Sequence, residues 1–188
     1  MRHIMGYLTG MAVMVIMSGC AGVAYEKYAS KDPLLHVSMD KVSGWSATES
    51  RGAGGSYAQV TFLAADPKIQ AIISLVSRSR SNAGGHDLQG AVNDLFAKRM
   101  KFADCKLIRR SKGAMAGLPA EILEVSYRMP ASMKDPSAGL VLEREKIVVA
   151  AGKDGFYFLR YQNDSKDFDA YARAFDHIVK TVVFKIPG

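Results

Sequence analysis

The sequence has few cysteines, no long apolar run and no catalytic or metal-binding motif. Cys20 and Cys105 are the only cysteines among 188 residues, which excludes a disulfide framework. No stretch reaches the roughly 20 apolar residues of a membrane-spanning helix. The patterns CxxC, HxH, HExxH and GxSxG do not occur. The sequence therefore predicts no metal, no cofactor and no enzymatic activity, in a chain long enough to fold without disulfides.

Positive charge is concentrated in one segment. The formal net charge of the chain is +7. Residues 98–112 hold seven lysines and arginines against Asp104 alone, so this segment carries +6 and the rest of the chain +1. Such a segment favours anionic partners, for example lipid headgroups or an acidic protein surface. Charge alone would also allow nucleic acid.

The start of the chain has the pattern of a secretory signal peptide. A short positive stretch precedes 14 uncharged residues, and small residues follow. Residues 17–20, MSGC, resemble the lipobox of bacterial lipoproteins, in which an aliphatic and two small residues precede the cysteine that is lipidated. Met17 stands where leucine is usual. We expect residues 1–19 to be a lipoprotein signal peptide and Cys20 to carry the lipid anchor. The alternative is cleavage after Ala24, which would leave a soluble periplasmic protein.

A lipid anchor implies a location in the cell envelope. Two or more acyl chains hold a protein at a membrane stably, whereas one chain holds it only marginally. Ala21 follows the cysteine, and it is not the aspartate that resembles an inner-membrane retention signal. We therefore favour the periplasmic face of the outer membrane over the inner membrane. In this location the membrane is a partner through the anchor, and we expect no nucleic acid as a partner.

The mature chain is predicted to consist of a tether and one domain. Residues 20–37 are assigned to the lipidated cysteine and the tether, because residues 21–36 show no sustained apolar period and Pro33 interrupts them. Fully extended, this tether would reach at most about 55 Å. Residues 38–188 contain no repeat, low-complexity tract or second linker, so we expect a single globular domain there.

The apolar spacing within this domain switches between two and 3.6 residues, the periods of strands and helices. Strands are expected at residues 44–50, 56–65, 71–79, 105–112, 118–129, 142–150 and 156–162. Two amphipathic helices are expected, one from about Leu88 to Lys101 and one from about Ser165. The order is three strands, a helix, four strands and a helix, with tight turns between neighbouring strands. This order predicts an α+β fold with a mostly antiparallel sheet.

Four segments carry a resemblance to a known family. They are residues 43–47 (SGWSA), 117–127 (GLPAEILEVSY), 155–161 (GFYFLRY) and 175–184 (FDHIVKTVVF). With the helix in mid-chain they resemble the PsbP-like superfamily, which includes extrinsic photosystem subunits, a Ran-binding eukaryotic protein and bacterial envelope lipoproteins of the DcrB type. The resemblance implies an α/β/α sandwich of about six or seven strands with two main helices. It also implies a non-enzymatic binding or assembly module that docks on larger membrane complexes. In one departure, residues 42–43 replace the proline often found before the Gly-Trp pair.

The basic segment supplies the candidate partner-binding residues. Lys106, Arg110 and Lys112 share strand parity and are expected to face one way, with Arg109 near the turn. These four side chains would form a patch for anionic headgroups or for an acidic partner in an envelope protein complex. A lipid anchor would raise the effective concentration of this second contact. The alternative is a solvated edge strand, which commonly carries lysine.

Two other functions stay open as alternatives. A small-ligand or lipid-binding periplasmic domain would need a roomy apolar cleft, lined by residues such as Trp45, Phe156 and Phe158. A thiol-dependent enzyme would use Cys105, and it predicts rapid reaction of the folded protein with a thiol reagent.

Cys105 can be interpreted in two ways. Lys101, Lys106 and Arg109 would lower the pKa of a Cys105 thiol in an enzyme. The other interpretation of Cys105 is a small buried apolar residue.

Acids and bases alternate at residues 143–146, and cross-strand ion pairing on a solvated face explains this alternation.

Overall fold

A seven-stranded antiparallel sheet forms the centre of the fold. The computed structural model describes residues 22–81, 87–131 and 136–184. The strands lie in the order β3-β4-β5-β9-β8-β7-β6. Their bounds are β3 (Ser46–Arg51), β4 (Tyr57–Leu63), β5 (Ile72–Ser79), β6 (Ala103–Met115), β7 (Leu118–Pro130), β8 (Leu140–Ala151) and β9 (Gly155–Asp164). Each of the seven overlaps a strand expected from the sequence, so the predicted α+β fold with a mostly antiparallel sheet is confirmed.

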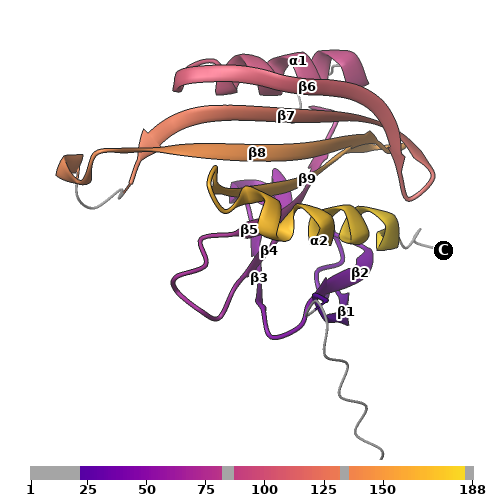
Figure 1. Cartoon of the computed structure of the whole chain (residues 1–188). Coiled ribbons are helices and arrows are strands. Elements are labelled where there is room, and N and C mark those ends of the chain that lie inside the picture. The colour runs from indigo at the N-terminus through magenta and orange to yellow at the C-terminus, as the bar shows by residue number, and fades with distance from the viewer. Residues whose placement is uncertain (1–21, 82–86, 132–135, 185–188) are drawn as a thin grey trace, which may run out of the picture.

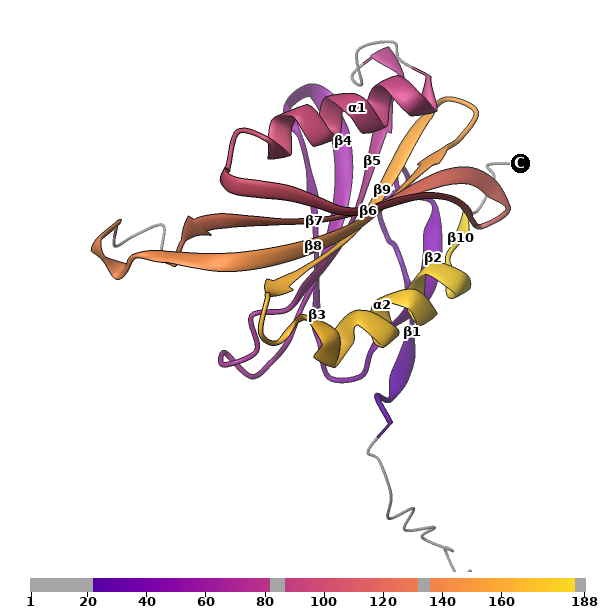
Figure 2. The ribbon, with the colours of Figure 1, turned by 45° about the horizontal axis from the view of Figure 1, so that its top comes forward.

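Helices cover both faces of this sheet (Figure 1). On one face α1 (Leu88–Arg99) packs on β7 and β8, and on the other α2 (Phe168–Thr181) packs on β9. A smaller sheet lies beside α2 (Figure 2), in the order β1-β2-β10. Its strands are β1 (Tyr25–Ala29), β2 (Val37–Val42) and β10 (Val183–Phe184), and two short 3-10 helices are η1 (Ala53–Gly55) and η3 (Pro136–Ala138). In the described part of the chain, no helix is long and apolar enough to cross a membrane.

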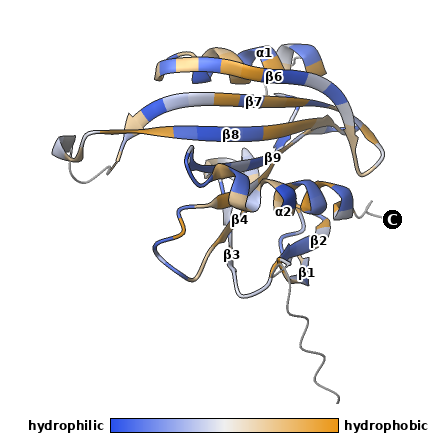
Figure 3. Ribbon diagram, viewed as in Figure 1, coloured by the Kyte–Doolittle hydropathy of each residue, from blue (hydrophilic) through white to orange (hydrophobic). Residues whose placement is uncertain are grey.

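The described residues form an apolar cluster on each side of the large sheet. The larger cluster fills the space between the sheet and the layer of α2 and β2, and it includes the fully buried Tyr161 and Phe175. The smaller cluster lies under α1 and includes Val92 and Leu123. Both helices therefore bury one side, and Figure 3 shows apolar and polar positions alternating along each of them.

Local side-chain contacts fix where the helices begin. The Asp87 carboxylate accepts a hydrogen bond from the Gly90 backbone N–H at 2.7 Å, which caps the start of α1. The Tyr161 hydroxyl donates to the Phe168 backbone carbonyl at 2.6 Å, so the start of α2 is held against β9. At the far end of α2, His177 Nε2 lies 2.8 Å from Asp40 Oδ2 and joins the helix to β2.

The small sheet corrects the predicted tether. Within residues 20–37, the segment Tyr25–Ala29 is a strand, β1, which pairs with β2 from Tyr25 opposite Val42 to Ala29 opposite Ser38. Folded structure therefore begins by Tyr25, and residues 21–24 alone separate it from Cys20. The five residue steps from Cys20 to Tyr25 span at most about 18 Å, far less than the length expected for the whole tether. Cys20 itself and the predicted signal peptide, residues 1–19, lie outside the described residues.

Candidate interaction surface

β6 forms one edge of the large sheet, and it carries three exposed cations. Among the described strands it pairs with β7 alone. Lys106, Arg109 and Lys112 are all exposed, and no ion pair joins them to any residue that the structure describes. Free positive charge of this kind attracts anionic groups. We call Lys106, Leu107, Ile108, Arg109 and Lys112 the edge surface.

Register shifts in β6 distribute the cations over both faces of the sheet. One extra residue lies between the pairing positions of Ala103 and Lys106, and another follows Leu107. Lys106 lies opposite Ser126 of β7, and Lys112 lies opposite Glu121. β7 pairs with β8 without interruption, so its side chains alternate strictly between the two faces of the sheet. Ser126 and Glu121 are five residues apart and point to opposite faces, and so do the residues of β6 that lie opposite them.

The prediction that Lys106, Arg110 and Lys112 face one way is therefore wrong. The extra residue after Leu107 reverses the alternation of side chains along β6, as a β-bulge does. Lys106 and Arg109 lie on the face that α2 covers, whereas Arg110 and Lys112 lie on the face of α1.

Arg110 is bound to other residues of the protein and is therefore not a free cation. Its Nε donates to Glu121 Oε2 at 2.8 Å, and its Nη1 donates to Asn93 Oδ1 of α1 at 3.0 Å. This guanidinium holds α1 against the sheet. Of the four candidate residues, three are thus available to a partner.

Large apolar side chains are exposed beside the free cations. Leu107 and Ile108 expose 44% and 48% of their surface, and Met100 and Phe102 in the preceding turn expose 53% and 40%. The Phe102 ring stacks on Tyr127 with 4.8 Å between ring centroids. Exposed apolar groups that are flanked by charge are typical of interaction sites. Figure 3 shows an apolar segment between polar ones in β6.

A buried ion cluster supports this end of the sheet. Glu145 of β8 is fully buried, and its Oε1 accepts hydrogen bonds from Arg99 at 2.9 Å and from Arg160 at 2.6 Å. Burial alone raises the pKa of the Glu145 carboxyl. The hydrogen bond from Arg99 and the charge of Arg160 outweigh burial and hold that pKa below its ordinary value. Since Arg99 ends α1, the cluster fixes the turn that leads into β6.

This cluster corrects the expected solvated face at residues 143–146. The two acids, Glu143 and Glu145, are buried. The two bases point to the other face, where Arg144 pairs with Glu124 and Lys146 pairs with Asp176 of α2. Cross-strand ion pairs are present, between Arg144 and Glu124 and between Glu145 and Arg160, but the face that holds Glu143 and Glu145 is buried and not solvated.

The surroundings of Cys105 do not activate its thiol. Burial raises the pKa of the Cys105 thiol; Arg99 lowers it in part, and Glu145 raises it further. A thiol-dependent enzyme requires a lowered thiol pKa, whereas the surroundings of Cys105 raise it. Within the ranges that the structure describes, no group of three or more His, Cys, Asp or Glu side chains is placed to hold a metal ion.

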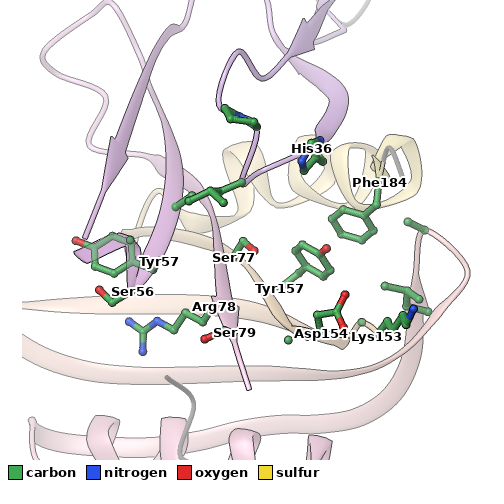
Figure 4. Close-up of a pocket in the computed structure, with 18 residues that line it drawn as sticks. His36, Ser56, Tyr57, Ser77, Arg78, Ser79, Lys153, Asp154, Tyr157 and Phe184 are labelled. Atoms are coloured by element: carbon green, nitrogen blue, oxygen red, sulfur yellow. The ribbon is translucent and has the colours of Figure 1, made fainter. Parts of the chain in front are cut away.

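A cavity of about 540 Å³ lies at the other end of β6 (Figure 4). Segments far apart in the sequence line it, including the loop before β2, the starts and ends of β4, β5 and β9, the turn after β6, and β10. Tyr157 and Phe184 stack across one side of it with 3.8 Å between ring centroids, and Lys153 and Asp154 lie near them. An aromatic wall with a few polar groups suits a small ligand.

The aromatic residues expected to line a cleft do not line this cavity. Trp45, Phe156 and Phe158 are buried in the two apolar clusters, with 8% exposure or less. The residues that do line the cavity have no common sequence pattern, because they come from turns and strand ends that meet only in the folded chain.

Comparisons with known proteins show the fold. No protein-family model and no curated protein matches the chain. Among solved structures, the PsbP protein of the cyanobacterium Synechocystis is similar over 89% of this chain and 96% of its own, with a TM-score of 0.52 and 13% identity. LpqN of Mycobacterium tuberculosis, described as involved in cell envelope biogenesis, is similar over 87% of this chain and 92% of its own, with a TM-score of 0.51 and 14% identity.

A third similar structure is eukaryotic. The Ran-binding protein Mog1p of Saccharomyces cerevisiae is similar over 87% of this chain and 96% of its own, with a TM-score of 0.52 and 8% identity. At such low identities a likeness shows the fold alone. The chain therefore has a PsbP-like fold, as its sequence motifs suggested.

Proposed function

We propose that this chain is a bacterial envelope lipoprotein of the DcrB type, anchored through Cys20, that acts as a non-enzymatic binding or assembly module. Its partner contacts the edge surface. The observation that carries the proposal is the edge surface itself: three exposed cations without a described ion pair stand beside exposed Leu107 and Ile108 on the free edge of β6. Two of the similar proteins are described as Ran-binding and as involved in envelope biogenesis, which supports a binding role.

The short connection to Cys20 favours a partner other than the anchoring membrane. The five residue steps from Cys20 to Tyr25 let β1 lie at most about 18 Å from a lipidated cysteine. β6 lies on the opposite side of the fold from β1 (Figure 1), with the rest of the large sheet and α2 between them. A chain held in this way directs the edge surface away from the membrane, into the periplasm if the anchor is in the outer membrane.

The anchor is tested by the change Cys20→Ser. Only a thiol can take the diacylglycerol thioether, so we expect the variant to lose its acyl mass and to leave the membrane fraction. Mass spectrometry and fractionation of cell envelopes measure both. A variant that stays membrane-bound with unchanged processing would show that Cys20 is not the anchor.

The binding role is tested by co-purification from solubilised envelopes. In the edge variant Lys106, Arg109 and Lys112 are all changed to Gln, and in the matched control variant Lys68, Arg173 and Lys180, exposed cations elsewhere, are changed to Gln. Both variants lose the same charge, but only the first loses it at β6. We expect a partner protein to be recovered with the wild type and the control variant and to be lost with the edge variant. Equal recovery with all three would contradict the role of the edge surface.

The cavity supports a second candidate function, the binding of a small periplasmic ligand. Its volume of about 540 Å³ and its stacked Tyr157 and Phe184 carry this alternative. Changing Ser77, which is only partly buried at the cavity wall, to Phe would narrow the cavity at a position outside β6. If this change removes function in the cell while partner recovery is unaffected, the ligand site is the functional one.

A further inference from the structure

Over residues 109–115, the edge of β6 is a regular strand along which another strand could pair. Each of these seven residues lies opposite a residue of β7 without interruption, from Arg109 opposite Glu124 to Met115 opposite Leu118. In an antiparallel pair, alternate residues direct their N–H and C=O groups away from the neighbouring strand. Among the described residues, none of these outward groups has a backbone partner. Seven residues also exceed the common length of a strand.

The earlier half of β6 is not regular in this way. Its two extra residues, one before Lys106 and one after Leu107, interrupt the pairing and increase the local twist. Proteins often protect an exposed edge in this way. Residues 109–115 have no such interruption, and no proline.

The cations of this edge lie on both faces of the sheet. Lys106 and Arg109 lie on the face of α2, and Lys112 lies on the face of α1. A flat surface can contact only one of these faces. A strand added along residues 109–115 directs successive side chains to alternate faces, so it can reach Arg109 on one face and Lys112 on the other.

We propose that residues 109–115 bind an extended acidic segment of a partner protein, which adds to the large sheet as a further strand. Main-chain hydrogen bonds hold the segment, its carboxylates meet Arg109 and Lys112, and Lys106 lies just before the paired residues. This inference rests on the proposed function and states how the partner binds.

Charge excludes the other occupants of the edge. A second copy of this chain would pair β6 with β6 and bring Arg109 and Lys112 close to the same cations of its partner, and like charges on neighbouring strands are unfavourable. An anionic membrane would meet the cations of one face only, and it offers no hydrogen-bonding edge.

The test measures binding of a labelled acidic peptide to the full-length protein in detergent micelles by fluorescence anisotropy. The peptide Thr-Glu-Val-Glu-Glu-Val-Glu-Thr-Val carries glutamates on both faces when extended. A second peptide has the same sequence and charge but is N-methylated at alternate amides, so it cannot complete the main-chain ladder. We expect saturable binding of the first peptide and at least about tenfold weaker binding of the second.

The variants of the protein separate charge from fold. The edge variant, with Lys106, Arg109 and Lys112 changed to Gln, should bind the acidic peptide about tenfold more weakly, as expected for the loss of two exposed ion pairs and of the charge of Lys106 beside them. The control variant with Lys68, Arg173 and Lys180 changed to Gln should bind like the wild type at the same ionic strength.

Four outcomes overturn the inference: no binding of the acidic peptide, equal binding of the N-methylated peptide, a wild-type dimer joined through β6, or edge-dependent binding to phosphatidylglycerol vesicles without peptide binding. The co-purification experiment distinguishes these from failure of the proposed function. If the partner protein is lost with the edge variant while the peptides do not bind, the surface is a docking site that does not use strand addition.

Discussion

The change Glu145→Gln is expected to lower the free energy of unfolding by about 3 kcal/mol. Glu145 is fully buried and accepts hydrogen bonds from Arg99 and Arg160. Removing its charge leaves two guanidinium groups facing a neutral amide in the interior. Both arginines are partly exposed, at 14% and 30% of their side-chain surface, so water compensates some of the loss. The effect therefore falls at the lower end of the range for a broken buried pair. Urea denaturation at pH 7 measures it.

Two further measurements test whether the effect of Glu145→Gln comes from the buried charge: loss of an exposed ion pair, and the dependence of stability on pH. Asp94→Asn breaks the exposed pair with Lys98 and should cost no more than about 0.5 kcal/mol. Because the pKa of Glu145 is lowered in the folded state, its charge stabilises the protein fully above the ordinary carboxyl pKa of about 4.3. That contribution is lost as the pH falls through the folded-state pKa. The difference between wild type and Glu145→Gln should therefore shrink below about pH 4. An unchanged difference at pH 3 would show that the cluster does not act through this charge.

The change Phe175→Ala is expected to destabilise the fold by about 3–5 kcal/mol. Phe175 is fully buried and lies 5.9 Å from Tyr161 between ring centroids, at the contact between α2 and the large sheet. Truncation leaves a cavity that neither the helix nor the strand can close without moving. Thermal or urea denaturation followed by circular dichroism measures the loss. Arg173→Ala, on the exposed side of the same helix, should change stability by less than about 0.5 kcal/mol. Equal effects of the two changes would mean that α2 is not docked on the sheet as described.

Strong periodic signals explain why the strands of the large sheet were predictable. In β7 the apolar residues Leu123, Val125 and Tyr127 alternate with more exposed positions, and the structure buries all three. The α2 stripe has similarly regular spacing, and it includes the buried Phe175 and Ile178. Such patterns depend only on local periodicity, which the sequence shows directly.

Features that depend on distant parts of the chain were not predictable. Residues 25–29 show no apolar alternation in the sequence, because β1 lies at the edge of the small sheet and exposes most of its residues. The predicted common face of the basic residues is wrong because one extra residue after Leu107 reverses the alternation of side chains along β6. No residue type at this position signals a bulge. Burial of Glu145 depends on Arg99 and Arg160, which approach it from α1 and β9.

The candidate site was predictable in its residue types but not in its arrangement. The residue types were informative, because three of the four candidate cations are exposed and have no described ion pair. Their arrangement was not, because Arg110 meets Glu121 and Asn93 only in the folded protein. The cavity at the other end of β6 had no sequence signal, since turns and strand ends from the whole chain form it.

Photo-crosslinking in intact cells tests the role of the edge surface most directly. A photoreactive phenylalanine derivative replaces Leu107 of β6 in one strain, and in another it replaces Leu63 of β4, which has a similar exposure of 40% against 44%. We expect irradiation to give a discrete adduct with a partner protein from position 107 and none from position 63. The adduct from position 107 should disappear when Lys106, Arg109 and Lys112 are changed to Gln. An adduct from position 63 alone, or none from position 107, would contradict the assignment of the edge of β6 as the binding surface.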